Sequence, residues 1–178
     1  MRKPHNPQSR ITNVRSFLPR QRFAGEFRPL VAQEAGEFLA HLGRLSPEDR
    51  RRRFGNPIRD GAMANFVARI DWSSGLVIGY FEGGYLRGAI QLAAAGEGYE
   101  AATAELAIQI ESDWQGRGIG SALLRKARAA ARKRGVGRLI FFALAENQGV
   151  TALLSKFGAR FRRVGSDVTG DLPLAVPA

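Results

Sequence analysis

A glycine-rich stretch at residues 111–124, ESDWQGRGIGSALL, carries the clearest chemical signal in the sequence. Gly116, Gly118 and Gly120 stand immediately before a run of alanine and leucine with the spacing of a helix. Glycines let a backbone approach a ligand closely, and the N-terminus of a helix presents N–H groups and partial positive charge to an anion. The stretch therefore predicts a pyrophosphate-binding turn, and a glycine-rich turn without a ligand is the alternative.

Two common nucleotide-binding motifs can be compared with this stretch. A Walker loop needs lysine after its last glycine, but Ser121 follows Gly120 here. A dinucleotide-binding fingerprint needs a third glycine where Leu123 stands, and it opens a repeated strand–helix pattern that this region lacks. Both motifs are excluded, which leaves a glutamine and two glycines, Gln115-x-x-Gly118-x-Gly120, between a strand and a helix.

The elements on either side of this turn follow from hydrophobic patterning. Residues 105–111 alternate like a strand, and after the turn an amphipathic helix runs to about Arg134. The continuous apolar run LIFFAL at 139–144 predicts a buried strand. A strand–helix–strand unit normally forms a right-handed crossover between parallel strands. The two faces of the first strand are predicted to carry Leu106, Ile108 and Ile110 on one side and Glu105, Ala107, Gln109 and Glu111 on the other.

The remaining sequence predicts further strands and helices around this unit. SPEDRRRRF at 46–54 is a helix start, with Ser46 as N-cap and Pro47 at the first helical position. Its arginines, Arg50–Arg53, are predicted to form a solvated face. The other predicted elements are a strand at 27–31, helices at 32–45 and 61–71, strands at 76–81 and 85–92 in a hairpin, a loop at 93–103, a helix at 147–157, and strands at 161–164 and 172–176.

Hairpins combined with one parallel pair predict a mixed sheet. The fold class is therefore α+β, or α/β in a looser usage, and we expect one domain over residues 25–178. The 178 residues suffice for a domain with its own hydrophobic core. No run approaches the roughly 18 apolar residues of a membrane span, so we expect no membrane partner.

Cysteine and charge narrow the class of protein further. The sequence has no cysteine, which excludes disulfides, thiolate metal sites and a cysteine nucleophile and fits a reducing cytoplasm. The net charge of +11 should attract anions. Residues 1–24 contain only basic charges, so we expect a disordered basic tail there, although an arginine-rich start also resembles a transit peptide.

The order of motifs resembles a known superfamily. Gln115, Gly118 and Gly120 after a strand, followed by LIFFAL and by ENQGVTALLSKFG, are similar to the GCN5-related N-acetyltransferases (GNAT) over roughly residues 25–176. LSPEDRRRRF and AELAIQIESDWQGRGIG look closest to bacterial protein lysine acetyltransferase domains. The resemblance implies a mostly antiparallel sheet with helices on both faces, whose parallel strands near 105–111 and 139–144 splay apart as a cleft for acetyl-CoA.

The resemblance also implies how acetyl-CoA, the acyl donor, would be held without a metal. Backbone N–H groups of the turn would bind the pyrophosphate, the strand before it would pair with the pantetheine amides, and the region of Ile110 would polarise the thioester carbonyl. Arg117 and Lys156 would reach phosphates, although a solvated basic face explains both as well. The implied cofactor-binding set is Ile108, Gln109, Ile110, Gln115, Gly116, Arg117, Gly118, Ile119, Gly120, Ser121, Asn147 and Lys156.

The catalytic groups are predicted from what the sequence offers. With no cysteine, and with His5 and His41 far from the motif, direct attack by a substrate amine is the economical mechanism. Glu105 matches the glutamate of similar lysine acetyltransferases and is the predicted base, with Glu111 in reserve. Many family members carry a tyrosine acid where Leu154 aligns. The acid is then water, another residue such as Tyr80, Tyr85 or Tyr99, or unnecessary, because the CoA thiolate is already a tolerable leaving group.

Three functions fit these observations. The first is an N-acetyltransferase that acts on a protein lysine or a small-molecule amine, as a monomer or homodimer. The second is a nucleic-acid or ribosome-binding module, favoured by the net charge and by the basic helix. The third is a CoA-sensing regulator without turnover. The basic residues of that helix are Arg125, Lys126, Arg128, Arg132, Lys133 and Arg134.

Overall fold

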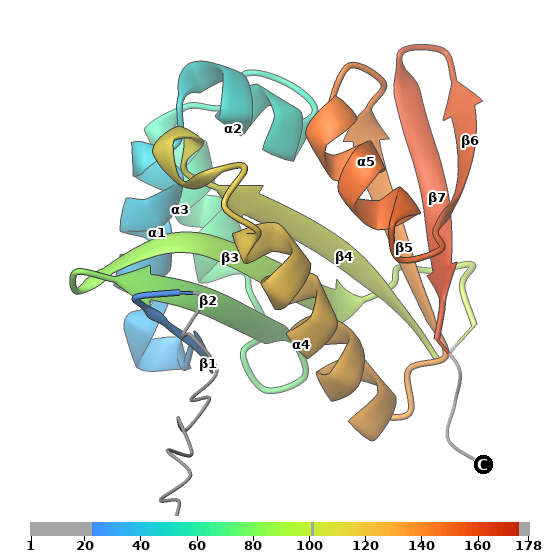
Figure 1. Cartoon of the computed structure of the whole chain (residues 1–178), viewed down its shortest axis with the longest axis horizontal. Helices are drawn as coiled ribbons and strands as arrows, with labels where there is room; N and C mark the ends of the chain where they lie inside the picture. Colours follow the sequence, from blue (N-terminus) through green and yellow to red (C-terminus); the bar gives the residue numbers. More distant parts are fainter. Residues whose placement is uncertain (1–22, 101, 175–178) are drawn as a thin grey trace, which may run out of the picture.

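The computed structural model describes residues 23–100 and 102–174, and its strands form one sheet (Figure 1). The sheet has seven strands within these residues, in the order β1-β2-β3-β4-β5-β7-β6. Every neighbouring pair is antiparallel except β4 and β5, which confirms the predicted mixed sheet. The bounds are β1 Glu26–Pro29, β2 Leu76–Glu82, β3 Tyr85–Ala94, β4 Thr103–Ile110, β5 Arg138–Leu144, β6 Arg160–Val164 and β7 Asp167–Pro173.

Helices lie on both faces of this sheet (Figure 1). One face is covered by α4 (Ile119–Lys133) and α5 (Gln148–Ser155), and the other by α1 (Ala35–Arg44), α2 (Pro47–Phe54) and α3 (Asp60–Ala68). Short 3-10 turns, η1 (Ala32–Glu34) and η2 (Ser112–Trp114), precede α1 and the glycine turn. The predicted start of α2 is confirmed, because the hydroxyl of Ser46 accepts the N–H of Asp49 at 3.1 Å.

Two hydrophobic clusters hold the layers together. On one face, α4 packs Leu123, Leu124 and Ala127 against the sheet while its basic residues point outward. On the other face, Phe38 and Met63 join α1 and α3 to β2 and β3. This second cluster covers only the first half of the sheet. Over β5, β7 and β6 the same face carries no helix among the described residues.

The uncovered part of the sheet exposes large apolar side chains. Phe142 on β5 is 54% exposed and Val164 on β6 is 51% exposed. The strand register pairs Phe142 with Thr169 of β7, which in turn pairs with Arg162 of β6, so these three side chains share one face. The sheet therefore presents an open surface with apolar and basic groups beside the half that α1 and α3 cover.

The parallel pair β4–β5 is short. Its register joins Thr103 to Arg138, Ala104 to Leu139 and Glu105 to Ile140, and no pairing continues beyond Glu105. Figure 1 shows the two strands diverging from this point. Strand β4 keeps its other partner, β3, as far as Ile110. The backbone edge of residues 106–110 on the β5 side is therefore left without a strand.

Some element bounds differ from those predicted. The last strand was expected at 172–176, with residues 165–171 as a loop, but β7 begins at Asp167 and only Gly165 and Ser166 form the turn. Residues 175–178 lie outside the described part. Most of the predicted tail at 1–24 also lies outside it. Phe23, within that predicted tail, is described by the structure and packs edge-to-face on Phe27.

The packing of β7 against β5 requires a glycine at position 170. A Cβ added at Gly170 would lie 2.3 Å from the Phe141 ring and 2.4 Å from the carbonyl oxygen of Arg160. We expect Gly170→Ala to destabilise the protein by about 1–3 kcal/mol, because backbone and a buried ring must both shift. Chemical denaturation with urea measures this change.

Gly36→Ala is the matched control for this substitution. Gly36 lies within α1, and a Cβ there would meet no heavy atom within 4 Å. Alanine favours a helix over glycine, so this variant should be as stable as the parent protein or more stable. Equal stability of both variants would contradict the close packing of β7 on β5.

Candidate functional site

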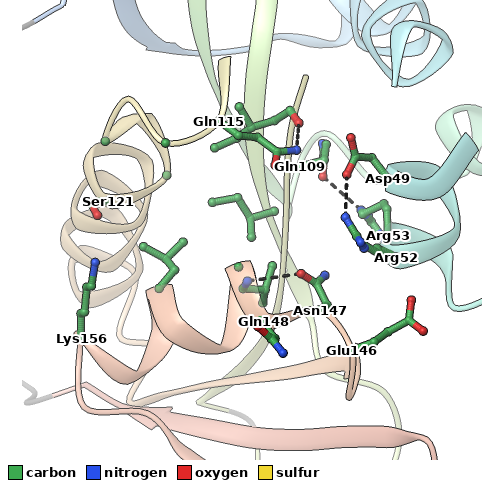
Figure 2. A pocket seen from close by; sticks show the side chains of 18 residues that line it. Asp49, Arg52, Arg53, Gln109, Gln115, Ser121, Glu146, Asn147, Gln148 and Lys156 are labelled. Carbon is green, nitrogen blue, oxygen red and sulfur yellow. Dashed lines mark hydrogen bonds and ion pairs between the residues drawn. The ribbon is translucent and has the colours of Figure 1, made fainter. Parts of the chain in front are cut away.

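A cavity of about 540 Å³ opens where β4 and β5 diverge (Figure 2). Its walls come from β4, the glycine turn and the first residues of α4, and it is closed by α5 and α2. This volume falls in the range of small-molecule sites. The lining residues are Asp49, Arg52, Arg53, Ile108, Gln109, Ile110, Gln115, Gly116, Gly118, Gly120, Ser121, Glu146, Asn147, Gln148, Gly149, Val150, Leu153 and Lys156.

The glycine turn is shaped by backbone that other residues rarely adopt. Gly116 and Gly118 have φ angles of 72° and 85°. Gln115 holds the turn to the strand, because its Nε2 donates to the carbonyl oxygen of Ile110 at 3.0 Å. A Cβ at Gly120 would lie 3.2 Å from the side chain of Leu153, so glycine also permits close approach between α4 and α5.

Two helices begin at this cavity. Helix α4 starts at Ile119, directly after Gly118, and α5 starts at Gln148, with Asn147 as its N-cap. The Oδ1 atom of Asn147 accepts the N–H of Val150 at 3.3 Å. The free N–H groups at the starts of α4 and α5 give the cavity a positive potential in addition to that of its basic side chains. Lys156 lies at the end of the cavity away from Arg53 (Figure 2).

A second cavity, of about 620 Å³, lies over the face of β4 that carries Glu105. Its floor includes the exposed Phe142 and Thr169, and its wall is the C-terminal end of α2. Arg52, Arg53, Ile108, Asn147 and Val150 line both cavities. The two spaces therefore meet at the point where the β4–β5 pairing ends.

Helix α2 spans this meeting point and is tied to both sides of it. Asp49 accepts the hydroxyl of Ser112, just before the glycine turn, at 2.6 Å. Arg51 forms an ion pair with Glu146, which lies between β5 and α5. At the end of the helix, Arg53 donates through Nε to Gln109 at 3.1 Å and through Nη2 to Gln91 at 3.1 Å. Burial lowers the pKa of Arg53 to about 10, which still leaves it cationic at neutral pH.

Glu111 is the centre of a buried ionic cluster behind the turn. Its carboxylate accepts from Arg44 Nε at 2.7 Å and from Arg87 Nη1 at 3.0 Å, and it lies 3.2 Å from Nδ1 of His41. Burial by itself would raise the pKa of Glu111, but hydrogen bonds from His41, Arg44 and Arg87 outweigh it and lower the pKa to about 2. The cluster thereby anchors the end of β4 to α1 and β3.

The structure brings most of the predicted binding residues together. All of the predicted cofactor-binding set line the first cavity except Arg117, which is exposed and stacks on Trp114, and Ile119, whose side chain is buried in the core. Glu105 lines the second cavity, whereas Glu111 lines neither of these two. The expectation that His41 lies far from the glycine-rich stretch is wrong, because His41 is fully buried and its Nδ1 atom lies 3.2 Å from Glu111, the first residue of that stretch.

The residues considered as general acid lie away from the cavities. Leu154 is fully buried in the core, and Leu153, one position earlier, lines the first cavity instead. Tyr80 is buried against Phe27 and Trp114, while Tyr85 and Tyr99 are exposed. No tyrosine is among the described residues that line either cavity.

Sequence reasoning missed the contribution of α2. Arg50–Arg53 were expected to be a solvated face, but Arg52 and Arg53 reach the cavities and Arg53 is hydrogen-bonded to two buried glutamines. Four consecutive arginines cannot share one side of a helix, so helical periodicity gave a signal that at least one of them faces inward.

A metal-binding cluster and a membrane-spanning helix are both absent from residues 23–100 and 102–174. No three His, Cys, Asp or Glu side chains lie close enough together to hold a metal ion. In the same part of the chain, no helix has the length and apolar character needed to cross a lipid bilayer.

Comparisons with known proteins agree with this geometry. Residues 45–159 match the profile of the Acetyltransferase (GNAT) family. The fold resembles the GNAT domain of S. lividans PAT, with 24% identity, 84% of this chain and 90% of that chain covered, and a TM-score of 0.73. A GNAT-family acetyltransferase from Streptococcus pneumoniae shares 21% identity, with 85% and 99% covered and a TM-score of 0.70.

A third solved structure contains a ligand. It is a GNAT superfamily phosphinothricin acetyltransferase from Sinorhizobium meliloti in complex with AcCoA, with 16% identity, 85% of this chain and 89% of that chain covered, and a TM-score of 0.67. At such identities the likeness establishes the fold alone. No curated protein sequence matches the chain.

The Glu111 cluster yields a prediction about stability. We expect Glu111→Gln to lower the free energy of unfolding at pH 7 by about 1–3 kcal/mol, because it removes the carboxylate that pairs with the buried His41 and with the partly exposed Arg44 and Arg87. The folded pKa of Glu111 lies below the value near 4.5 of an unperturbed carboxyl, so its stabilisation is present above pH 4.5 and is lost as the pH falls toward 2.

Urea denaturation at several pH values measures this effect. The difference between the parent protein and Glu111→Gln should narrow as the pH falls from about 4.5 toward 2. Glu97→Gln is the control, because Glu97 is exposed in the loop between β3 and β4 and forms no ion pair with a described residue. A difference for Glu111→Gln that stays constant over this range would contradict the assigned pKa.

Proposed function

The chain belongs to the acetyltransferase (GNAT) family, and from this membership we propose that it transfers an acetyl group from acetyl-CoA directly to a primary amine. The acceptor is a small-molecule amine or a protein lysine, and no covalent enzyme intermediate forms. The observation that carries the proposal is the cavity at the end of the β4–β5 pairing, where two helices begin beside an unpaired strand edge.

The first cavity is suited to acetyl-CoA. The N–H groups at the start of α4, shaped by Gly116 and Gly118, would bind the pyrophosphate, and Lys156 lies at the same end for a further phosphate. The free edge of Ile108–Ile110 offers backbone groups to the amides of the pantetheine arm. Asn147 is held by its capping bond to Val150 and lies where the arm would pass.

The acceptor amine would enter through the second cavity. A lysine-like amine has a pKa of about 10.4, so at neutral pH nearly all of it is protonated and cannot attack. Glu105 lines this cavity beside the junction and is the carboxylate that would take the proton, directly or through water. The neutral nitrogen then attacks the thioester carbonyl carbon and gives up its second proton to water. The C–S bond breaks, and the thiolate of CoA leaves.

Glu111, the reserve base, has a different role in this proposal. Three cationic or hydrogen-bonding partners hold it ionised down to about pH 2, so it is a poor proton acceptor, and it lines neither cavity. We assign it to anchoring the end of β4. Since no tyrosine lines the described cavities, the leaving thiolate takes its proton from water.

One observation supports each of the two other functions, the CoA-sensing regulator and the nucleic-acid module. The regulator without turnover is favoured by the absence of tyrosine from the described cavity walls. The nucleic-acid module is favoured by the outward basic face of α4, where Arg125, Lys126 and Lys133 are exposed. Neither function explains why both cavities meet beside Glu105. Acetyl-CoA binding without CoA release on any amine would favour the regulator.

Substitution of Gly118 tests the cofactor site. Gly118→Ala forces a left-handed backbone on a residue with a Cβ, so we expect roughly tenfold or greater loss of affinity for acetyl-CoA by calorimetric titration. Gly98→Ala is the matched control, because Gly98 has a similar φ of 88° but lies in a loop that lines neither cavity. Equal affinities of the two variants would contradict the pyrophosphate site.

Substitution of Glu105 tests the base. Glu105→Gln should lower kcat/KM for the amine by about 100-fold or more while acetyl-CoA still binds, since only proton removal is lost. The loss should shrink as the pH rises and more amine becomes neutral. Glu100→Gln, in the preceding exposed loop, is the control. Unchanged turnover by Glu105→Gln across this pH range would exclude Glu105 as the base.

A further inference from the structure

The junction between the two cavities contains hydrogen-bond donors without acceptors. Gln109 is only 6% exposed, and its buried Nε2 atom has no partner among the described residues. Its Oε1 atom is already used, because it accepts Nε of Arg53. The Nη2 atom of Arg53 donates to Gln91, and Nη1 has no described acceptor. Gln109 Nε2 is enclosed by protein atoms, so the N–H groups left for an acceptor-rich group at this point are those of Arg53 Nη1.

The positive charge of the Arg53 guanidinium at this junction also has no ion-pair partner among the described residues. Arg53 forms no ion pair with any acidic side chain of the described residues, whereas the adjacent Arg52 is paired with Glu48 and Asp49. Phe54 and Phe66 lie 4.9 and 5.2 Å from the Arg53 guanidinium, which holds the group in place. Glu105 favours its charged form electrostatically from a longer distance.

The other charged groups around the two cavities leave this cation available. Arg162 and Asp167 lie on the far wall formed by β6 and β7, and Glu146 is paired with Arg51. The junction therefore holds a guanidinium that two glutamines fix through Nε and Nη2 and that forms no ion pair with a described acidic side chain. A planar carboxylate can accept hydrogen bonds from the remaining N–H groups of this guanidinium.

We propose that Arg53, positioned by Gln109, forms a binding site for a carboxylate carried by one of the two substrates of the transfer reaction. The inference rests on the proposed function, because the site lies where acyl donor and amine would meet. Arg53 lines both cavities, so the carboxylate belongs either to the acceptor, an amine with an acidic group, or to the distal end of a dicarboxylic acyl chain.

Two comparisons of kcat/KM separate these sources. In the first, acetyl-CoA is used with primary amines, each as the free carboxylate and as its neutral carboxamide. In the second, succinyl-CoA is compared with butyryl-CoA on an amine without a carboxylate. Each comparison is repeated with Arg53→Gln and Gln109→Met. Dividing the carboxylate preference of the parent protein by that of each variant cancels differences in amine basicity.

We expect the parent protein to prefer the carboxylate in one of the two comparisons by roughly tenfold to a hundredfold, the range of hydrogen bonds to charged groups. Arg53→Gln should remove most of this preference and Gln109→Met part of it. Arg59→Gln is the control, because Arg59 is exposed, lines neither cavity and should keep the full preference. If Arg53→Gln does not fold, Arg53→Lys replaces it, and loss of the planar fork should still reduce the preference.

Turnover without a carboxylate preference in either comparison would overturn this inference and leave the proposed function intact. A preference that survives in both Arg53→Gln and Gln109→Met would overturn it as well. No CoA release with any amine, together with no binding of acetyl-CoA, would instead overturn the proposed function itself. A preference in the first comparison assigns the carboxylate to the acceptor, and one in the second assigns it to the acyl chain.

Discussion

The early end of the pairing between β4 and β5 is the constraint on which the rest of the site depends. Only three residue pairs join these parallel strands, the last of them Glu105 with Ile140. Beyond that point the backbone N–H and C=O groups on the β5 side of β4 have no strand to pair with. Because polar backbone groups are rarely left unsatisfied, we expect a partner other than a strand to bind them. The glycine turn and the starts of α4 and α5 then place further N–H groups around the same space. A long ligand could pair its amides with the free edge of β4 and its phosphates with the N–H groups of the turn and the helix starts.

The second half of the site depends on α2, a short helix with almost no apolar surface. Three polar connections hold it across the junction, from Asp49 to Ser112, from Arg51 to Glu146, and from Arg53 to Gln91 and Gln109. The helix thereby couples the turn, the β5–α5 loop and the buried face of the sheet. On the same face of the sheet, the Glu111 cluster ties the C-terminal end of β4 to α1 and β3. Together these contacts fix β4 and α2 relative to the two cavities.

Local patterns in the sequence predicted the elements that carry the site, and non-local contacts account for what was missed. Alternation over 105–110 and the glycine spacing were sufficient to predict β4, the turn and α4. The sequence GSDVTGD looks like a loop, because the strand character of its residues 167–171 comes from pairing with β5 and β6 on both sides. Likewise, the burial of Glu111 depends on His41, Arg44 and Arg87, which are distant in sequence. Arg53 was misjudged because its glutamine partners lie on β3 and β4.

Hydrogen–deuterium exchange with and without acetyl-CoA tests the central claim most directly, because it reports which backbone amides the ligand protects. The account predicts slower exchange in residues 106–121, at the unpaired edge of β4 and the glycine turn, and in residues 147–150 at the start of α5, with little change in α1 and α3. Protection confined to the basic face of α4, or no protection at the cavity even at about 1 mM acetyl-CoA, would contradict it.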